Sequence, residues 1–102
     1  MASFLRKVVL DVLKPHEPDI VAVSKELAEL EGVEGVNISV YELDKKVENV
    51  KITVEGKFSN VDKIRDIINK IGGSIHSTDE VVAGRKIVEE EETLQERIQE
   101  QH

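Results

Sequence analysis

The sequence predicts one α+β domain whose elements follow the order strand, helix, strand, strand, helix, strand. Two observations carry this prediction. The apolar residues change from a two-residue rhythm, typical of strands, to spacings of three and four, typical of helices, and later change back. The chain has 102 residues, which is too few to bury two independent cores, so all the elements must share one.

The first strand is expected over residues 4–13, which are mostly aliphatic and β-branched. Such a run is typical of a strand that is buried on both faces and is therefore central in its sheet. Pro15 should end it, because proline has no N–H for the ladder. A helix should follow, with Pro18 in its first turn and Gly32 as its end. Its apolar stripe consists of Ile20, Val23, Leu27 and Leu30.

Two half-buried strands are predicted next, over residues 36–41 and 50–55, where apolar and polar residues alternate. The charged residues 42–49 between them should form the hairpin connection. Ser59 and Asp62 resemble a capping box at the start of a second helix, and Gly72-Gly73 should stop it. The apolar stripe of this helix consists of Val61, Ile64, Ile67, Ile68 and Ile71.

The last extended segment begins at Ser74 and is longer than a single edge strand requires. A turn near Asp79, followed by apolar residues up to Val88, predicts a strand plus an extra hairpin arm, with Gly84 at a bulge or tight bend. With right-handed crossovers, the element order gives a four-stranded antiparallel sheet in the order 4-1-3-2, with both helices on one face. This is the ferredoxin-like βαββαβ arrangement.

We assign residues 1–88 to the folded domain and residues 89–102 to an acidic C-terminal tail. The tail holds six Glu and one Arg, so it carries −5 of the net charge of −7 and leaves −2 for the domain. Its composition favours a helix, and Leu94 and Ile98 could dock on a neighbour. A frayed, solvated terminus is the other interpretation.

Composition excludes several classes of function. The chain lacks the excess of Lys and Arg that neutralises phosphates, which argues against nucleic acid as a partner. It contains no cysteine, so disulfides, thiolate zinc sites and cysteine nucleophiles are excluded. The apolar run near the N-terminus is too short and too interrupted for a signal peptide or a membrane span. A cytoplasmic protein with no membrane partner is expected.

The predicted architecture leaves one sheet face without helices. Parity along the strands assigns Val9, Leu13, Tyr41 and Leu43 to that face. A sheet face with several large apolar groups is usually covered, so we predict an oligomer interface there. Burial beneath the C-terminal arm, or a partly apolar surface on a monomer, are the other interpretations.

Ligand sites are indicated by residue type alone. His16, Glu17 and His76 are candidate ligand-binding residues, and Asp79 and Glu80 are candidate metal ligands. If their loops converge, the carboxylates suit a divalent cation, calcium or magnesium, while the histidines favour a transition metal. Ordinary surface charge is the other interpretation. Residues 74–80 also contain the residue types of a hydrolytic triad, but in a regular strand His76 and Ser77 point to opposite faces.

Three phrases of the sequence resemble a known family. They are LDVLKPHEP at residues 10–18, GVEGVNI at residues 32–38 and GGSIHSTDEVVAG at residues 72–84. Together they resemble an archaeal family classified as a domain of unknown function, over nearly all of residues 4–89. Thr78 departs from that resemblance, since an aliphatic residue is expected there. The resemblance implies a ferredoxin-like fold and assembly into homo-oligomers, and it assigns no catalytic residue.

Three functions remain open from sequence. The first is a non-enzymatic, homo-oligomeric binding or regulatory module for a small molecule or cation. The second is a hydrolase or transferase with an active site at a subunit interface, in which His16 or His76 is the general base. The third is an RNA-binding domain, although its sheet would offer few aromatic side chains for base stacking.

Overall fold

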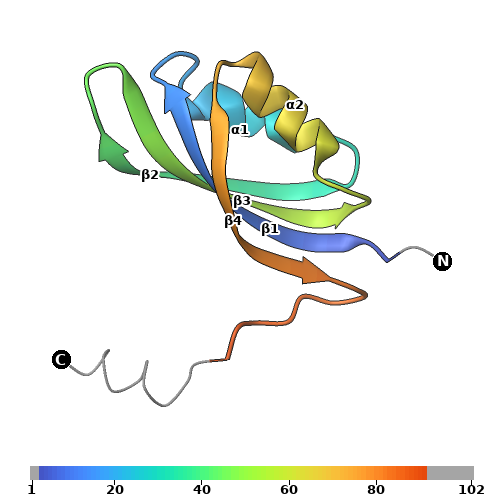
Figure 1. Cartoon of the computed structure of the whole chain (residues 1–102). Coiled ribbons are helices and arrows are strands. Elements are labelled where there is room, and N and C mark those ends of the chain that lie inside the picture. The colour runs from blue at the N-terminus through green and yellow to red at the C-terminus, as the bar shows by residue number, and fades with distance from the viewer. Residues whose placement is uncertain (1–2, 92–102) are drawn as a thin grey trace.

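The computed structural model describes residues 3–91. Its four strands form one antiparallel sheet in the order β2-β3-β1-β4, and both helices cover the same face (Figure 1). This confirms the predicted ferredoxin-like α+β fold and the strand order. The elements are β1 (Leu5–Pro15), α1 (Ile20–Ala28), β2 (Val33–Leu43), β3 (Val47–Phe58), α2 (Asp62–Lys70) and β4 (Ser74–Ala83).

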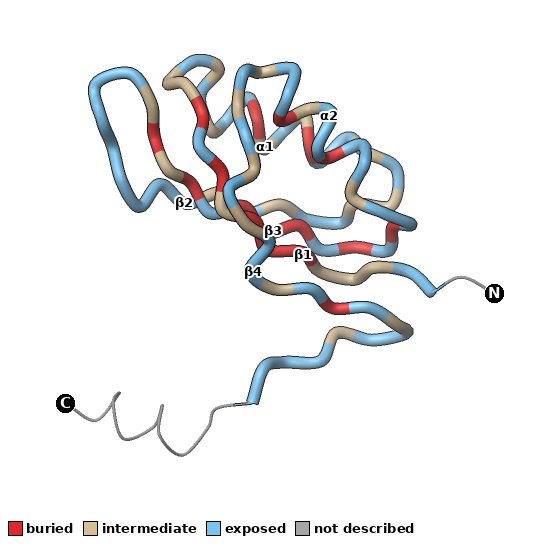
Figure 2. Tube along the Cα trace, in the orientation of Figure 1, coloured by how far each residue is buried: buried red, intermediate tan, exposed pale blue. Residues whose placement is uncertain are grey.

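The core lies between the helices and the sheet face that they cover. β1 pairs with β3 on one side and β4 on the other, so it is central, as predicted. Its residues Val8, Leu10 and Val12 are fully buried beneath the helices, and Figure 2 shows the buried positions concentrated along β1 and β3. The remaining core residues are Val23, Leu27, Val50, Ile52, Val54, Phe58, Ile64 and Ile68. Burial of this set, which is aliphatic except for Phe58, drives folding.

Both helices begin one residue or more away from the predicted start. The carboxylate of Asp19 caps α1 by accepting a hydrogen bond from the N–H of Ala22 at 2.9 Å. Pro18 therefore precedes the cap and is not in the first turn. The predicted capping box of Ser59 and Asp62 is wrong, because no side chain of that pair caps α2. Instead, Asn60 Oδ1 accepts a hydrogen bond from the N–H of Asp62 at 3.0 Å.

Of the two predicted glycine stops, Gly72-Gly73 is confirmed and Gly32 is wrong, because α1 already ends at Ala28 with Glu29 as its cap, and Gly32 lies in the turn before β2. Gly32 and Gly72 both have φ of +85°, a left-handed conformation that other residues rarely adopt. After α2, the N–H of Gly73 donates to the carbonyl of Ile68 at 2.9 Å, which satisfies a backbone acceptor at the helix end.

The hairpin connection between β2 and β3 is much shorter than predicted. Both strands extend into the charged residues 42–49, and only residues 44–46 form the turn, which the Asp44 N–H closes by donating to the Val47 carbonyl at 2.9 Å. Charge misled the prediction because Glu48, a strand residue, is buried. Its partner is described below.

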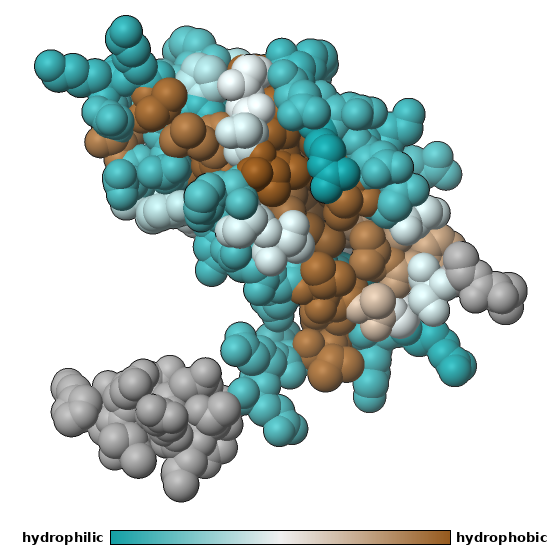
Figure 3. Space-filling model, in the orientation of Figure 1, coloured by the Kyte–Doolittle hydropathy of each residue, from teal (hydrophilic) through white to brown (hydrophobic). Residues whose placement is uncertain are grey.

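The prediction of a turn near Asp79 and an extra hairpin arm is wrong. β4 is one strand from Ser74 to Ala83, and residues 84–91 form no further strand. The bend at Gly84 is confirmed, since φ is +119° and its N–H donates to the Phe4 carbonyl at 2.9 Å. Apolar side chains reach the surface around this end of β4 (Figure 3), where Val81 and Val88 are exposed.

The acidic tail predicted from residue 89 is described as far as Glu91. Residues 89–91 are exposed and non-helical, and the rest of the acidic tail, including Leu94 and Ile98, lies outside the described residues. Within residues 3–91, neither helix is long and apolar enough to cross a membrane.

The close approach of Gly56 to Gly32 gives a test of the fold. A Cβ atom at Gly56 would lie 2.1 Å from the Gly32 carbonyl oxygen and 2.9 Å from Val33 Cα, and both are backbone atoms that cannot swing aside. Gly56→Ala should therefore lower the free energy of unfolding by about 1–3 kcal/mol or more, measured by urea denaturation. Gly35→Ala is the matched control, because nothing lies within 4 Å of its added methyl group. Equal stability of the two variants would contradict this packing.

Candidate functional site

A row of polar side chains crosses the sheet face that neither α1 nor α2 covers, which we call the open face. The register places Asp11 on β1 opposite Lys51 on β3 and Ser77 on β4. Lys51 in turn lies opposite Ser39 on β2. Directly opposed residues of antiparallel strands point to the same side of a sheet. The polar row, formed by Ser77, Asp11, Lys51 and Ser39, therefore spans all four strands on the open face.

Three β-bulges add further polar side chains to this face. The register shows one extra residue at His76 and at Asp79 on β4, and at Tyr41 on β2. A bulged residue interrupts the alternation of side chains. His76 and Asp79 consequently share surface hollows with Asp11 and Tyr41, on the same face as Ser77. The prediction that His76 and Ser77 point to opposite faces is wrong for this reason.

Negative charge concentrates around the hydroxyl of Tyr41. This hydroxyl donates a hydrogen bond to the carboxylate of Asp11. That bond, desolvation and the nearby carboxylates of Asp11, Glu42 and Asp79 raise the pKa of Tyr41 to about 12. Ser77 Oγ donates to Asp79 Oδ1 at 2.7 Å, which holds that carboxylate in place. The centre of the open face is therefore anionic.

Two adjoining hollows lie over this anionic centre. One, of about 400 Å³, is lined by Asp11, Ser39, Tyr41, Lys51 and Asp79. The other, of about 340 Å³, shares Asp11 and Tyr41 and also contacts His76. Its remaining lining residues are Leu13, Glu42, Asn49 and Ser74. Both hollows are shallow, so a bound molecule would remain open to solvent or to a second protein surface.

A buried ion pair lies on the opposite, helix-covered face. The Lys14 ammonium is fully buried and donates to Glu48 Oε1 at 2.6 Å and to the Pro15 carbonyl at 2.8 Å. Glu48 is 7% exposed. Burying an ionised group is costly unless it is paired and hydrogen-bonded, and here each charge has its partner. The pair therefore fixes the end of β1 to the start of β3.

His16 is part of this structural cluster. Its Nδ1 lies 3.6 Å from Glu48 Oε2, and its Nε2 lies 2.8 Å from the carbonyl oxygen of Asp44. The imidazole thereby ties the connection after β1 to the β2–β3 turn. Glu17, the next residue, is exposed and precedes the cis peptide bond to Pro18.

The predicted ligand set therefore divides into two groups. His16 lies beside the buried pair and Glu17 is the exposed residue that follows it, whereas His76 and Asp79 lie on the open face. Glu80 also belongs to the open face, where its carboxylate lies 3.3 Å from the Lys7 ammonium and raises the pKa of that lysine. No group of three His, Cys, Asp or Glu side chains within residues 3–91 is close enough to hold a metal ion.

The residues predicted for an oligomer interface do not all share one face. Val9, Leu13 and Tyr41 belong to the open face. Val9 is only 4% exposed, however, so it is buried within the single chain without a second subunit. Leu43 lies opposite Glu48 and so points to the helix-covered side, because the bulge at Tyr41 shifts the parity by one residue. Leu43 is 69% exposed there. The open face is thus more polar than the sequence prediction assumed.

Two comparisons with known proteins bear on this chain. The family model of DUF211, with the description "Uncharacterized ArCR, COG1888", matches residues 6–97. The chain is also 55% identical over 93 residues to "Uncharacterized protein MJ0319" of Methanocaldococcus jannaschii. That alignment covers 91% of this chain and 96% of the relative. These matches confirm the resemblance noted from the three sequence phrases.

The buried ion pair predicts a large loss of stability when one partner is removed. Glu48→Gln leaves the Lys14 charge buried without its counter-ion, and should lower the free energy of unfolding by about 3–5 kcal/mol. The exposed pair Lys70–Glu26 is the matched control, and Glu26→Gln there should cost less than about 1 kcal/mol. Urea denaturation at neutral pH measures both, and similar losses would contradict the structural role of Lys14 and Glu48.

The Tyr41–Asp11 hydrogen bond can be followed through the titration of Tyr41, which is the chain's only tyrosine. Ultraviolet absorbance should report a pKa of about 12, and Asp11→Asn should return it toward 10.0, the ordinary value. Because the folded pKa is raised, the bond stabilises the protein below pH 10.0 and that contribution is lost as the pH rises toward about 12. Asp66→Asn on α2 is the control and should leave the titration unchanged.

Proposed function

The chain belongs to the DUF211 family, whose description names no activity. From its own side chains, we propose that it is a non-enzymatic binding module that works as a homo-oligomer. Its ligand is a divalent cation, calcium or magnesium, held on the open face between subunits. One observation carries the proposal: the carboxylates of Asp11, Glu42 and Asp79 line two adjoining hollows on either side of Tyr41, on the sheet face that neither α1 nor α2 covers.

The charge balance of this site supports a cation. Lys51 faces Asp11 across the strands and offsets one of the three carboxylates. The other two leave a net negative charge in hollows that solvent can enter. Carboxylate, amide and hydroxyl oxygens are the ligands that calcium and magnesium prefer, and Asn49, Ser39 and Ser74 lie in the same hollows.

The incomplete ligand set supports an oligomer. Calcium takes six to eight oxygen ligands, whereas residues 3–91 bring no three acidic or histidine side chains within reach of one ion. A second copy of the open face would supply the missing carboxylates and would also cover Leu13 and Tyr41, which are 37% and 56% exposed. Cation binding and self-association are then coupled, as a regulatory module requires.

The enzymatic alternatives receive less support. The Nδ1 of His16 faces the Glu48 carboxylate and its Nε2 faces the Asp44 carbonyl, so each nitrogen of this imidazole has a structural partner. For His76, the structure of residues 3–91 shows no hydrogen bond to a carboxylate, which a general base needs for its orientation.

RNA binding also receives less support. Tyr41 lies on the open face, but Phe4 packs against Lys57 at the end of the sheet, so the two aromatic rings do not form one stacking surface.

Light scattering combined with thermal unfolding tests the proposal. In millimolar Ca²⁺ or Mg²⁺ the solution mass should be that of two or more chains of 11.4 kDa each, and the Tm should rise by about 5 °C or more relative to chelator. Asp11→Asn/Asp79→Asn should abolish the rise in Tm. Asp66→Asn, an exposed carboxylate on α2, should preserve it.

A monomer of unchanged Tm in both cations would contradict the proposal. So would a double variant that responds to the cation as strongly as the parent protein does.

A further inference from the structure

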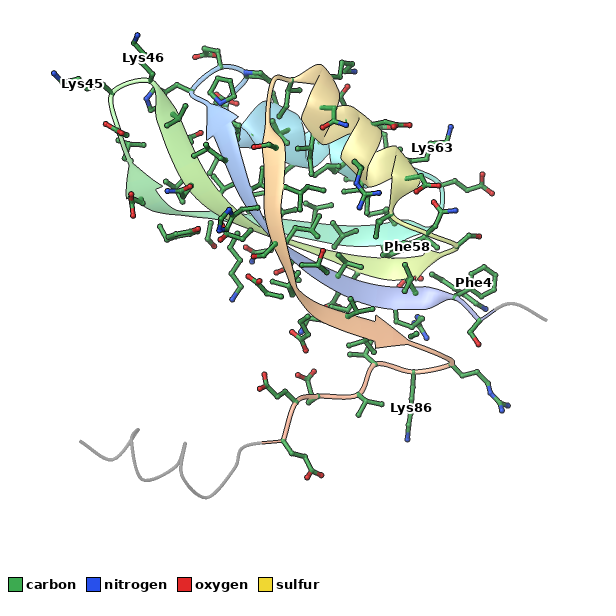
Figure 4. All side chains as sticks on the ribbon, viewed as in Figure 1. Phe4, Lys45, Lys46, Phe58, Lys63 and Lys86 are labelled. Atoms are coloured by element: carbon green, nitrogen blue, oxygen red, sulfur yellow. The ribbon has the colours of Figure 1, made fainter. Side chains whose placement is uncertain are left out.

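A further hollow, separate from the two on the open face, lies at the end of the molecule where β1 begins and β3 ends. It has a volume of about 700 Å³, within the range of small-molecule sites. Figure 4 shows Phe4, Phe58 and Lys63 together at this end, with Lys45 and Lys46 at the tip of the β2–β3 hairpin far from it. We call it the end hollow. Its lining residues are Phe4, Glu29, Leu30, Glu31, Gly32, Val33, Lys57, Phe58, Ser59, Asn60, Lys63 and Ile64.

The floor of the end hollow is apolar and is continuous with the buried core. Phe58 and Ile64 belong to the core and are 6% and 2% exposed, and Leu30 and Val33 pack against that core. Phe4 forms an exposed aromatic wall and is 41% exposed, with the Lys57 ammonium 5.1 Å from its ring centre. Such a floor suits an apolar side chain, because burying it removes apolar surface from water.

The charges around the floor separate by segment. Glu29 and Glu31 come from the connection between α1 and β2, whereas Lys57 and Lys63 come from the end of β3 and the first turn of α2. The ion pairs found within residues 3–91 involve none of these four residues. Two acids and two bases therefore border one hollow without neutralising each other.

From this arrangement we propose that the end hollow binds a zwitterionic small molecule with a large apolar side chain, the class to which leucine and phenylalanine belong. The ligand's carboxylate pairs with Lys57 and Lys63, its ammonium pairs with Glu29 and Glu31, and its side chain lies on Phe4, Phe58 and Ile64. A ligand of one charge gains one of these pairings and meets repulsion from the other side. The site is separate from the open face and does not depend on the function proposed above.

Isothermal titration calorimetry of the full chain with L-leucine and L-phenylalanine tests this site. Two analogues separate the charges: 4-methylpentanoate keeps the carboxylate without the amine, and 3-methylbutylamine keeps the amine without the carboxylate. Each should bind at least tenfold more weakly than leucine. The proposal is overturned if either analogue binds as tightly as leucine does, or if neither leucine nor phenylalanine binds.

Charge reversals locate the site. Lys63→Glu and Glu31→Lys should each weaken leucine binding at least tenfold, while Lys46→Glu at the hairpin tip should leave it unchanged. All three residues are exposed, so the fold should survive, and circular dichroism checks this. Asp11→Asn/Asp79→Asn should bind leucine normally, which keeps failure at this site distinct from failure at the open face. A loss in Lys46→Glu as large as in Lys63→Glu overturns the assignment.

A second measurement does not rely on variants. The chain has two phenylalanines, and both line the end hollow. After incorporation of 4-fluorophenylalanine, the ¹⁹F spectrum should show two resonances from the rings, and leucine should shift both. Leucine binding that shifts neither resonance would place the ligand elsewhere and overturn the proposal.

Discussion

The burial of β1 between β3 and β4 is the constraint on which the rest of the structure depends. Its alternate residues Val8, Leu10 and Val12 must point toward the helices, so the next residue of that parity, Lys14, must point there too. The cost of burying that ammonium is offset by Glu48 and by the carbonyls of Pro15 and His16. The same alternation directs Asp11 to the open face, opposite Lys51. One strand thus sets both the buried charge pair and the exposed polar row.

Much of the fold could be predicted because the apolar rhythm is a direct consequence of which face is buried. The six elements, the strand order and the glycine stop at Gly72 follow from that rhythm and from backbone sterics. Bulges are different, since one extra residue reverses the parity of all that follows. The extra residue at Tyr41 directs Leu43 to the other face. The extra residues at His76 and Asp79 interrupt the two-residue rhythm of β4, and in the sequence this interruption resembles a turn.

The candidate sites were predictable only in part. His76 and Asp79 were identified by residue type, but their proximity to Asp11 and Tyr41 depends on strand pairing across more than thirty residues of chain. Lys14 and Glu48 were missed although each continues the buried parity of its own strand, a signal that the charge of both residues obscured. The end hollow combines four separate segments and carries no local sequence signal at all.

The two edges of the sheet differ in regularity. On β2, residues 35–40 pair with β3 without interruption, so the outward N–H and C=O groups of that stretch follow an even spacing. On β4, only Ser77 and Thr78 lie between the two bulges and pair with successive residues of β1. An incoming strand can therefore form a continuous ladder on the β2 side alone. Sheet extension of this kind would stop at two copies, because joining two β2 edges would leave only the irregular β4 edges outside, and a continuous fibre of paired sheets would be disfavoured.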